Sequence, residues 1–280
     1  MAGITQPQQD FGAVPEASFS DAFRRMRDAL GPYFSVGVIL ITWELIAQFE
    51  LVIPFLLPAL SVVLMRVFAD TISGQLPFDI AITLYRTLVA FALAGVTGVT
   101  LGILIARISL IRWFFDPLVS IGLPMPKIAL LPIFMLWFGL FDLSKILMVA
   151  FSASFQIVVA TWSATLGVEK ELIWSARSLG ATDREILWQV ILPASLPQIL
   201  TGLQIAMPIC LIVILVTEMV MGGQGLGDSM LRSARYVDSP GVFAGIVEIG
   251  LVGICVIRTM EYLRRRLLVW HHETMTEATV

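Results

Sequence analysis

Long stretches almost free of charge are the feature that most constrains how this chain can fold. Residues 80–106 contain one charged side chain, Arg86, and residues 198–221 contain one, Glu218. About 20 mostly apolar residues are enough to cross the hydrocarbon core of a bilayer. Only 14% of the 280 residues are charged, against about 25% in soluble domains. Because backbone groups in lipid must bond within the protein, these stretches predict transmembrane helices and an all-α membrane protein.

Six stretches meet this criterion and predict six transmembrane helices, at residues 32–50, 80–106, 113–138, 145–163, 198–221 and 241–262. The third is the least regular, because Pro117, Pro124, Pro126 and Pro132 interrupt it. Repeated prolines remove backbone hydrogen bonds, which is tolerated at membrane depth only inside protein or beside water. Residues 122–132 are therefore expected near a translocation path or a dimer interface, although simple packing kinks explain them equally well. Residues 51–79 are predicted to be a loop with a short helix.

Three glycines of the second predicted span, Gly95, Gly98 and Gly102, would allow another helix to approach closely. We favour helix packing over a ligand-binding role for them.

Basic residues orient the spans, because cytoplasmic loops carry an excess of lysine and arginine. With the N-terminus inside, the cytoplasmic side holds Arg24, Arg25, Arg27, Arg107, Arg112, Lys170, Arg177, Arg184, Arg264, Arg265 and Arg266. The outer side then holds only Arg66, Lys145, Arg232 and Arg235. Both termini are therefore predicted to be cytoplasmic. The chain divides into a cytoplasmic tail with a surface helix over 19–30 (1–30), the six-span domain (31–265) and a second cytoplasmic tail (266–280).

The longest polar stretch on the cytoplasmic side, residues 168–197, carries the most specific pattern. Apolar residues at helical spacing predict a short helix that ends at Gly180, because glycine accepts the left-handed conformation of a helix C-terminus. Thr182 and Glu185 have the spacing of a capping box, which predicts the start of a second helix. Pro193 is predicted to end that helix, since the residue before a proline avoids helical conformation.

Neither of these helices is long enough to be stable alone, so their apolar sides must be covered. The spans, the lipid interface or another protein could all cover them. Spacing does not distinguish a hairpin lying on the membrane from one that docks a partner.

The order Ala176, Gly180, Val190, Leu192, Pro193 resembles the "EAA" loop of ABC importer permeases. Trp174 and Ser175 stand where that motif has Glu and Ala, so apolar packing should matter more here than a glutamate contact. The resemblance implies that the loop docks on a cytoplasmic ATPase. It assigns this coupling role to Trp174, Ser175, Ala176, Leu179, Gly180, Ala181, Leu187, Leu192 and Pro193.

Residues 123–132, 136–139, 191–206 and 223–228 also resemble the nitrate, sulfonate and taurine branch of these permeases. The resemblance implies a type I ABC importer permease with six spans and a coupling-helix loop in a bacterial inner membrane. The implied partners are a second copy of the permease, two cytoplasmic ATPase subunits, a periplasmic binding protein and membrane lipid. The chain itself would be no enzyme and hold no cofactor, because ATP and Mg²⁺ belong to the ATPase. The implied cargo is a small anionic solute.

The candidate residues for the translocation path are Met125, Lys127, Trp137, Met207 and Glu218. Lys127 is an ionisable group in an apolar stretch, which points to function. It could attract an anion or extend to the membrane interface. Glu218 could face the path or a docked binding protein, or form a structural ion pair with Arg86. The apolar candidates could equally face lipid or the core.

The glycine-rich residues 222–228 invite comparison with a phosphate-binding loop, but they lack its Gly-Lys-Ser/Thr ending. The predicted topology also places them outside the cell. We therefore predict a flexible external turn that meets the binding protein through Gln224, Asp228 and Arg232.

A secondary transporter or channel not driven by ATP is the main alternative function. A secondary transporter would normally show an internal repeat and coupling charges near the midplane, and neither is evident. A membrane enzyme has less support, since the sequence contains no His-Glu-x-x-His motif and no cysteine cluster. Nucleic acid is not expected as a partner, because no basic patch is large enough.

Overall fold

The computed structural model describes residues 19–268, with side chains from residue 34 onward. Throughout this range every regular element is a helix, which confirms the all-α class. The elements are α1 (Phe19–Gln48), α2 (Leu60–Ile72), α3 (Gln75–Arg107), α4 (Ser109–Gly122), the 3-10 helix η1 (Lys127–Leu130), α5 (Leu131–Phe138), α6 (Asp142–Leu166), α7 (Lys170–Ser178), α8 (Asp183–Glu185), the π-helix η2 (Ile186–Ile191), α9 (Leu192–Met221), α10 (Leu226–Arg235) and α11 (Ser239–Leu267).

The first compact unit, up to Ser61, contains α1 and the loop after it. The predicted surface helix at 19–30 is not separate, because α1 runs without a break from Phe19 to Gln48. The apolar part of α1 with described side chains is Phe34–Gln48. Glu44 within it is bonded locally, accepting hydrogen bonds from the Gln48 amide at 2.8 Å and the Ser61 hydroxyl at 2.9 Å. The predicted tails at 1–18 and 269–280 lie outside the described residues.

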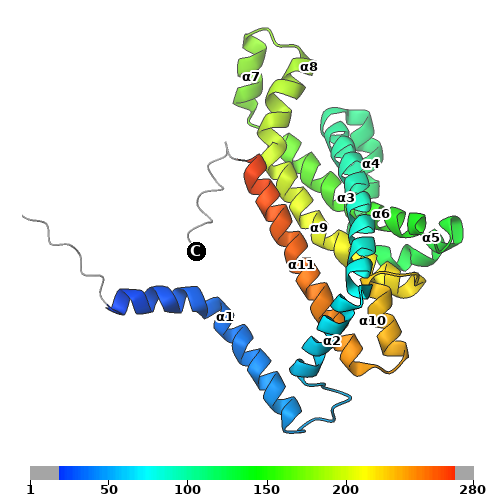
Figure 1. Ribbon diagram of the computed structural model, residues 1–280. Helices are drawn as coiled ribbons and strands as arrows, with labels where there is room; N and C mark the ends of the chain where they lie inside the picture. Colours follow the sequence, from blue (N-terminus) through cyan, green and yellow to red (C-terminus); the bar gives the residue numbers. More distant parts are fainter. Residues whose placement is uncertain (1–18, 269–280) are drawn as a thin grey trace, which may run out of the picture. The chain divides into compact units, whose positions relative to one another are not determined.

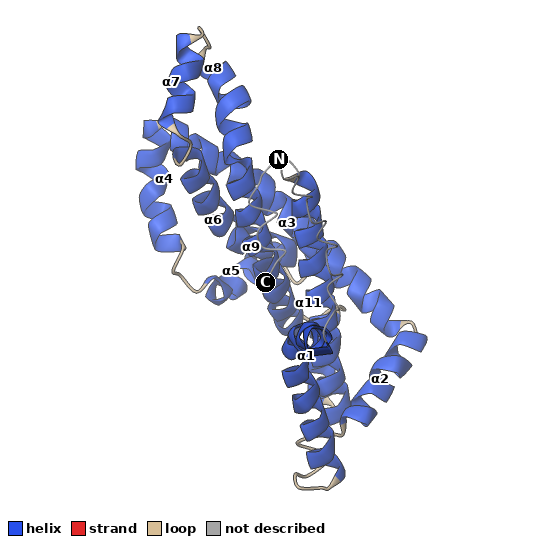
Figure 2. Cartoon of the chain, turned by 90° about the vertical axis from the view of Figure 1, so that its left-hand side faces the viewer, coloured by secondary structure: helices blue, strands red, loops and turns tan. Residues whose placement is uncertain are grey.

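The second unit, from Val62 onward, contains the other predicted spans. Four helices of the described range are long and apolar enough to cross a membrane: α3, α6, the helix Asp183–Met221 and α11. The third predicted span, at 113–138, is interrupted at its prolines, as the sequence indicates. The pair Ser109–Gly122 and Lys127–Phe138 is bent by 98° and counts as a fifth, broken span. Figure 2 shows the loop between α4 and α5 at this bend. Pro124 and Pro126 explain it, because proline supplies no backbone N–H and disfavours helix in the preceding residue.

Helix α3 begins at Gln75, before the predicted start of the second span at residue 80. Pro77 does not prevent this, since a proline in the first turn removes only an N–H that has no intrahelical partner. The additional turn brings Asp79 into the helix. Asp79, Thr83 and Arg86 then lie on one buried face, as their spacing of four and three residues requires.

The core forms where α3, α6 and α9 pack together (Figure 1). Small side chains make this possible, with Ala90 and Ala94 of α3 meeting Val149, Ala153 and Ile157 of α6 and Ala206 and Cys210 of α9. Gly98 and Gly102 continue the same face of α3 and are buried against α6. The interpretation of these two glycines as packing residues is confirmed. Gly95 faces more open space.

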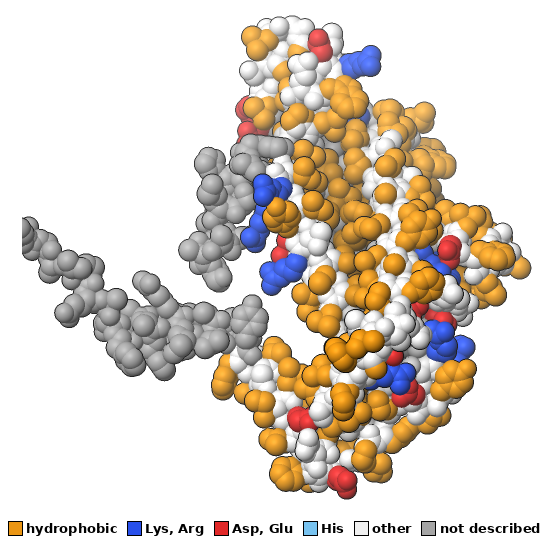
Figure 3. Space-filling view, viewed as in Figure 1, with side chains coloured by type: hydrophobic (Ala, Val, Ile, Leu, Met, Phe, Trp, Pro, Cys, Tyr) orange, Lys and Arg blue, Asp and Glu red, His pale blue; other side chains and the backbone are white. Residues whose placement is uncertain are grey.

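Apolar side chains also cover the outside of the second unit. Figure 3 shows them over α3, α9 and α11, and exposed members include Val96, Ile212, Leu251 and Ile254. Soluble proteins rarely expose such continuous apolar surface. Lipid is the solvent that this surface fits. Along the helix axes, α7 and α8 project at one end and α10 lies at the other (Figure 1).

Replacing Gly98 by alanine should destabilise the α3–α6 contact. A Cβ at this position would lie 2.8 Å from Ile157 Cβ and 3.2 Å from the Ser154 carbonyl oxygen. Overpacking of this kind costs about 1–3 kcal/mol. Gly95→Ala on the same helix is the control, because its Cβ would lie at an ordinary 3.6 Å from Leu203. Thermal unfolding in detergent should show a lower midpoint for Gly98→Ala only. Equal midpoints for the two variants would contradict the packing role.

Candidate functional site

The hairpin of residues 168–197 forms as the sequence predicts at its turn. Gly180 has φ +86°, the left-handed conformation that ends α7. The Ala181 N–H donates to the Ala176 carbonyl at 3.1 Å, and the Gly180 N–H donates to the Arg177 carbonyl at 2.9 Å. These two bonds are those of a Schellman motif. No side chain lies within 4 Å of a Cβ placed on Gly180, so only the backbone conformation demands glycine here.

The capping box is also confirmed. The Thr182 hydroxyl accepts a hydrogen bond from the Glu185 N–H at 3.3 Å, and the Glu185 carboxylate accepts one from the Thr182 N–H at 2.8 Å. The turn between the two helices is therefore fixed from both sides, by Gly180 and by Thr182.

The prediction that Pro193 ends the second helix is wrong. Helix continues from Asp183 to Met221 through a π-helical turn, η2. The Leu192 N–H donates to the Leu187 carbonyl, one residue further back than in an α-helix. Pro193 is the second residue of α9 and directly follows this π-helical turn. The hairpin is thereby joined to a transmembrane helix by continuous helical backbone.

The hairpin has its own small core. Val168, Ile186 and Ile191 are buried, and the partly buried Ile173, Ala176, Ala181 and Leu187 pack against them. Other apolar side chains of the hairpin point outward. Leu179 is 87% exposed and Trp174 is 59% exposed, and Leu172 and Trp188 are also exposed. The two helices thus cover each other on one side only, leaving an uncovered apolar surface at the tip.

The nine predicted coupling residues include both exposed and partly buried side chains. Trp174, Ser175, Leu179, Gly180 and Pro193 are exposed, whereas Ala176, Ala181, Leu187 and Leu192 are partly buried. The small side chains Ala176 and Ala181 allow the turn to close. The large exposed ones are free to contact another molecule.

At the opposite end of the core lies a buried ion pair. Glu218 of α9 is 0% exposed and Arg86 of α3 is 3% exposed, and Arg86 Nη1 lies 2.8 Å from Glu218 Oε1. The Thr83 hydroxyl donates to both Glu218 oxygens, at 3.0 and 3.1 Å, and the Gly227 N–H donates to Oε2 at 3.1 Å. The interpretation of Glu218 as a structural partner of Arg86 matches this geometry.

Arg86 also binds the turn after α9. Its guanidinium donates to the carbonyl oxygens of Gln224 at 2.8 Å and Gly223 at 3.1 Å, and pairs with Asp142 of α6 at 2.7 Å. Lys145, buried in α6, donates to the Gly222 carbonyl at 2.5 Å. Asp79 and Thr83 accept the N–H groups of Gly225 and Leu226, both at 3.0 Å.

The backbone of residues 222–227 is therefore anchored at successive positions, and the prediction of a flexible turn is wrong. Four consecutive residues, Gly222 to Gly225, have positive φ, which is why glycine occupies three of these positions. The Gln224 side chain remains exposed, while Asp228 accepts the Gln224 N–H at 3.2 Å and pairs with Arg232 at 3.5 Å.

The five candidate path residues lie on different segments and at different depths. Lys127 stands at the bend between α4 and α5, where its ammonium donates to the Leu123 carbonyl at 3.0 Å and lies 5.1 Å from the centre of the Phe155 ring. Met125 is next to it, and Trp137 is exposed on α5. Met207 and Glu218 are buried in α9. Only the first three are accessible for a role in a path.

Sequence reasoning missed Asp79, Thr83, Asp142 and Lys145, all of which support the anchored turn. A signal existed for two of them. Asp79, Thr83 and Arg86 share one face of an otherwise apolar helix, and polar groups on a buried helix face are expected to bond one another. Asp142 and Lys145 are far from them in sequence, so their contact needs the packing of α6 on α3.

Glu218→Gln should strongly destabilise the protein, because it removes the fully buried counter-charge of Arg86 and leaves only the half-exposed Asp142. Removing one partner of a buried ion pair costs about 3–5 kcal/mol. Asp183→Asn is the control, since Asp183 forms an exposed pair with Arg177 at 3.1 Å. Such a pair contributes about 0–1 kcal/mol. Detergent-solubilised protein should show a much lower unfolding midpoint for Glu218→Gln. A midpoint equal to that of Asp183→Asn would show that the ion pair is not structural.

Comparison with known proteins agrees with this architecture. Residues 98–269 match the family model described as the binding-protein-dependent transport system inner membrane component. The chain is 30% identical to the taurine transport system permease protein TauC of Escherichia coli, over 85% of this chain and 89% of that protein. It is 30% identical to the putative aliphatic sulfonates transport permease protein SsuC of Bacillus subtilis, over 84% and 86%.

Among solved structures, an amino acid ABC transporter has the same fold, with a TM-score of 0.58 and 18% identity over 72% of this chain and 96% of that chain. The family match covers the end of α3, all of α6 and α9, the hairpin and the anchored turn. The family match therefore argues against the alternative of a secondary transporter that is not driven by ATP. The chain belongs to the binding-protein-dependent transport system inner membrane components and is a permease subunit of an ABC importer.

Proposed function

We propose that two copies of this chain form the membrane pathway of an importer for a small sulfonate-like anion. In this proposal a periplasmic binding protein delivers the solute, and two cytoplasmic ATPase subunits, which bind ATP and Mg²⁺, drive the conformational change. The observation that carries it is the hairpin, with its fixed turn, its own core and its uncovered apolar tip.

The hairpin is suited to transmit force from an ATPase. Leu179 and Trp174 offer an apolar contact surface that the chain's described residues do not cover. The Schellman motif and the capping box hold the tip in one shape. Because helix runs from Asp183 to Met221, a displacement of the tip reaches the membrane directly. Trp174 supports a contact based on apolar packing.

The membrane orientation in this proposal places both termini and the hairpin in the cytoplasm. Lys170, Arg177 and Arg184 of the hairpin support it, because basic residues favour the cytoplasmic side. The turn at 222–228 then faces outward, where Gln224, Asp228 and Arg232 are available to the binding protein.

A second copy is proposed to cover the arm formed by α4, η1 and α5. Leu136, Trp137 and Phe141 on or next to α5 are strongly exposed. The bend places irregular backbone within a predicted span, which is tolerated where protein or a water-filled path surrounds it. Both conditions fit a pathway between two copies, with Met125, Lys127 and Trp137 facing it.

The names of the relatives support the class of cargo. TauC is named for taurine and SsuC for aliphatic sulfonates. Both classes carry a sulfonate, and the ammonium group of Lys127 at the bend is a suitable attractant for such an anion.

The hairpin role predicts that Gly180→Val uncouples ATP hydrolysis from uptake while leaving the protein in the membrane. Valine strongly disfavours the φ of +86°, so the tip should change shape. Gly180→Asn is the matched control, because asparagine tolerates this conformation. Proteoliposomes containing the whole transporter should show loss of uptake with Gly180→Val, together with ATPase activity that no longer responds to loaded binding protein. Coupled uptake by Gly180→Val would reduce the hairpin to a surface feature.

The cargo is tested by uptake of labelled taurine in the same proteoliposomes, with competition by an alkanesulfonate. We expect ATP-dependent uptake, and we expect Lys127→Gln to raise the concentration for half-maximal uptake about tenfold. Arg258→Gln is the control, since Arg258 is exposed and paired with Glu261 on its own helix. If Lys127→Gln behaves like this control, Lys127 does not bind the anion. If neither taurine nor alkanesulfonates are transported, the cargo assignment fails.

A further inference from the structure

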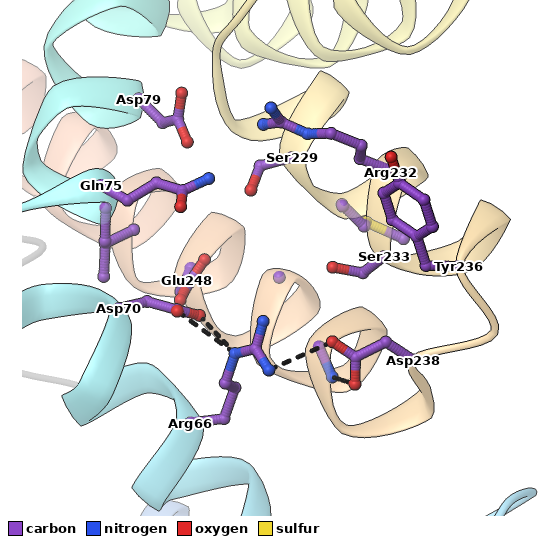
Figure 4. Close-up of a pocket in the computed structure, with 14 residues that line it drawn as sticks. Arg66, Asp70, Gln75, Asp79, Ser229, Arg232, Ser233, Tyr236, Asp238 and Glu248 are labelled. Carbon is purple, nitrogen blue, oxygen red and sulfur yellow. Dashed lines mark hydrogen bonds and ion pairs between the residues drawn. The ribbon is translucent and has the colours of Figure 1, made fainter. Parts of the chain in front are cut away.

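A polar cavity of about 200 Å³ lies among α2, α3, α10 and α11, beside the anchored turn. Figure 4 shows its lining, in which Gln75, Ser229, Ser233 and Tyr236 accompany several charged side chains. Asp79 belongs both to this lining and to the network that holds the turn, through the N–H of Gly225. The cavity is separate from the coupling hairpin and from the bend at Lys127.

Two arginines and four carboxylates line the cavity, and the arginines are already paired. Arg66 lies 3.0 Å from Asp70 and 3.2 Å from Asp238. The hydrogen bond with Asp70 raises the pKa of Arg66 above its ordinary value, so this side chain stays charged. Arg232 pairs with Asp228 at 3.5 Å. The remaining carboxylates of the lining are Asp79 and Glu248.

Glu248 is the group that lacks a partner. Its side chain is 7% exposed, and among the described residues its Oε1 atom has no hydrogen-bond donor. Figure 4 shows its carboxylate directed into the cavity beside Gln75 and Asp70. Asp79, 3% exposed, accepts a backbone N–H, and no cation between residues 34 and 268 forms an ion pair with either carboxylate. The positive charge of Arg66 acts on Glu248, but Arg66 forms its ion pairs with Asp70 and Asp238. A buried carboxylate oxygen without a hydrogen-bond donor is disfavoured.

The size and chemistry of the cavity favour an ammonium group as the missing partner. The volume exceeds the roughly 30 Å³ of one water molecule several times. An ammonium group has three donors and no acceptor. The ionised carboxylate of Glu248 can only accept hydrogen bonds, and the oxygens of Gln75, Ser229 and Tyr236 can accept them too. A metal ion fits less well, since the described residues contain no group of three or more His, Cys, Asp or Glu side chains arranged to hold one.

We propose that this cavity is a binding site for a primary ammonium group, with Glu248 as its counter-charge. The group can come from a free small amine or from the side chain of a lysine on the binding protein. The first source is independent of the proposed transport function, whereas the second rests on it.

The site is tested with full-length protein in lipid nanodiscs, titrated with methylammonium chloride against equal concentrations of sodium chloride. Saturation-transfer NMR on the methyl protons of the probe reports binding. We expect saturable binding that Glu248→Gln weakens at least tenfold. The control is Glu261→Gln, which changes a partly exposed carboxylate of the same helix that is paired with Arg258, and it should leave the affinity within twofold. Glu248→Asp, which keeps the charge, should retain part of the affinity.

Absence of saturable binding in the unmodified protein would overturn the proposal, and this result does not depend on whether any variant folds. A Glu248 that is simply protonated would give that result. Binding that sodium chloride abolishes at equal concentration, or that Glu248→Gln leaves unchanged, would overturn it too. Transport activity enters none of these measurements, so failure of the site and failure of the proposed function are distinguishable.

The source of the ammonium group is tested by the affinity of the binding protein for the same nanodiscs. If a lysine fills the cavity, methylammonium should compete with docking, and Glu248→Gln should weaken docking about tenfold while Glu261→Gln does not. If a free amine fills it, neither methylammonium nor Glu248→Gln should affect docking, while the unmodified protein still binds methylammonium. Either result supports the site and assigns its ligand.

Discussion

The buried ion pair between Arg86 and Glu218 is the contact on which the end of the second unit opposite the hairpin depends. It joins α3 to α9, and through Asp142 it also joins α6, so the three helices of the core meet at one charged node. The same guanidinium holds the carbonyl groups of the turn at 222–227. A charge buried at this depth is stable only when its hydrogen bonds are fulfilled. The turn fulfils them, and in return the turn is fixed in a backbone conformation that glycine makes possible.

The two ends of the second unit differ in which groups they bury and which they expose. At the hairpin end, two short helices cannot cover all of their apolar surface, and the uncovered part presents Trp174 and Leu179 outward. At the other end, polar groups are gathered inside and tie the chain to itself. The first arrangement suits reversible contact with another protein, and the second suits a fixed surface. The long helix Asp183–Met221 connects them, since it begins in the hairpin and carries Glu218 near its far end.

The arm formed by α4, η1 and α5 differs from the compact core. Its helices meet at 98°, and large apolar side chains at its end remain exposed. Lipid alone suits the regular outer faces of α3 and α11, but a broken backbone needs polar surroundings. The proposed second copy would provide them. The polar cavity around Glu248 differs from this arm. In our proposal a small cationic group fills it, whereas a second protein chain covers the arm.

The sequence by itself determined the helical class, most of the span positions and the turn of the hairpin. These depend on local chemistry, such as the apolar length of a segment, the φ of Gly180 and the spacing of Thr182 and Glu185. It did not determine that helix continues through Pro193, because the π-turn that accommodates the proline depends on how the hairpin packs. Nor did it show that Arg86, Asp142, Lys145 and Glu218 meet around residues 222–227. Those groups are far apart along the chain, and only the packing of α3, α6 and α9 brings their charges close enough to pair.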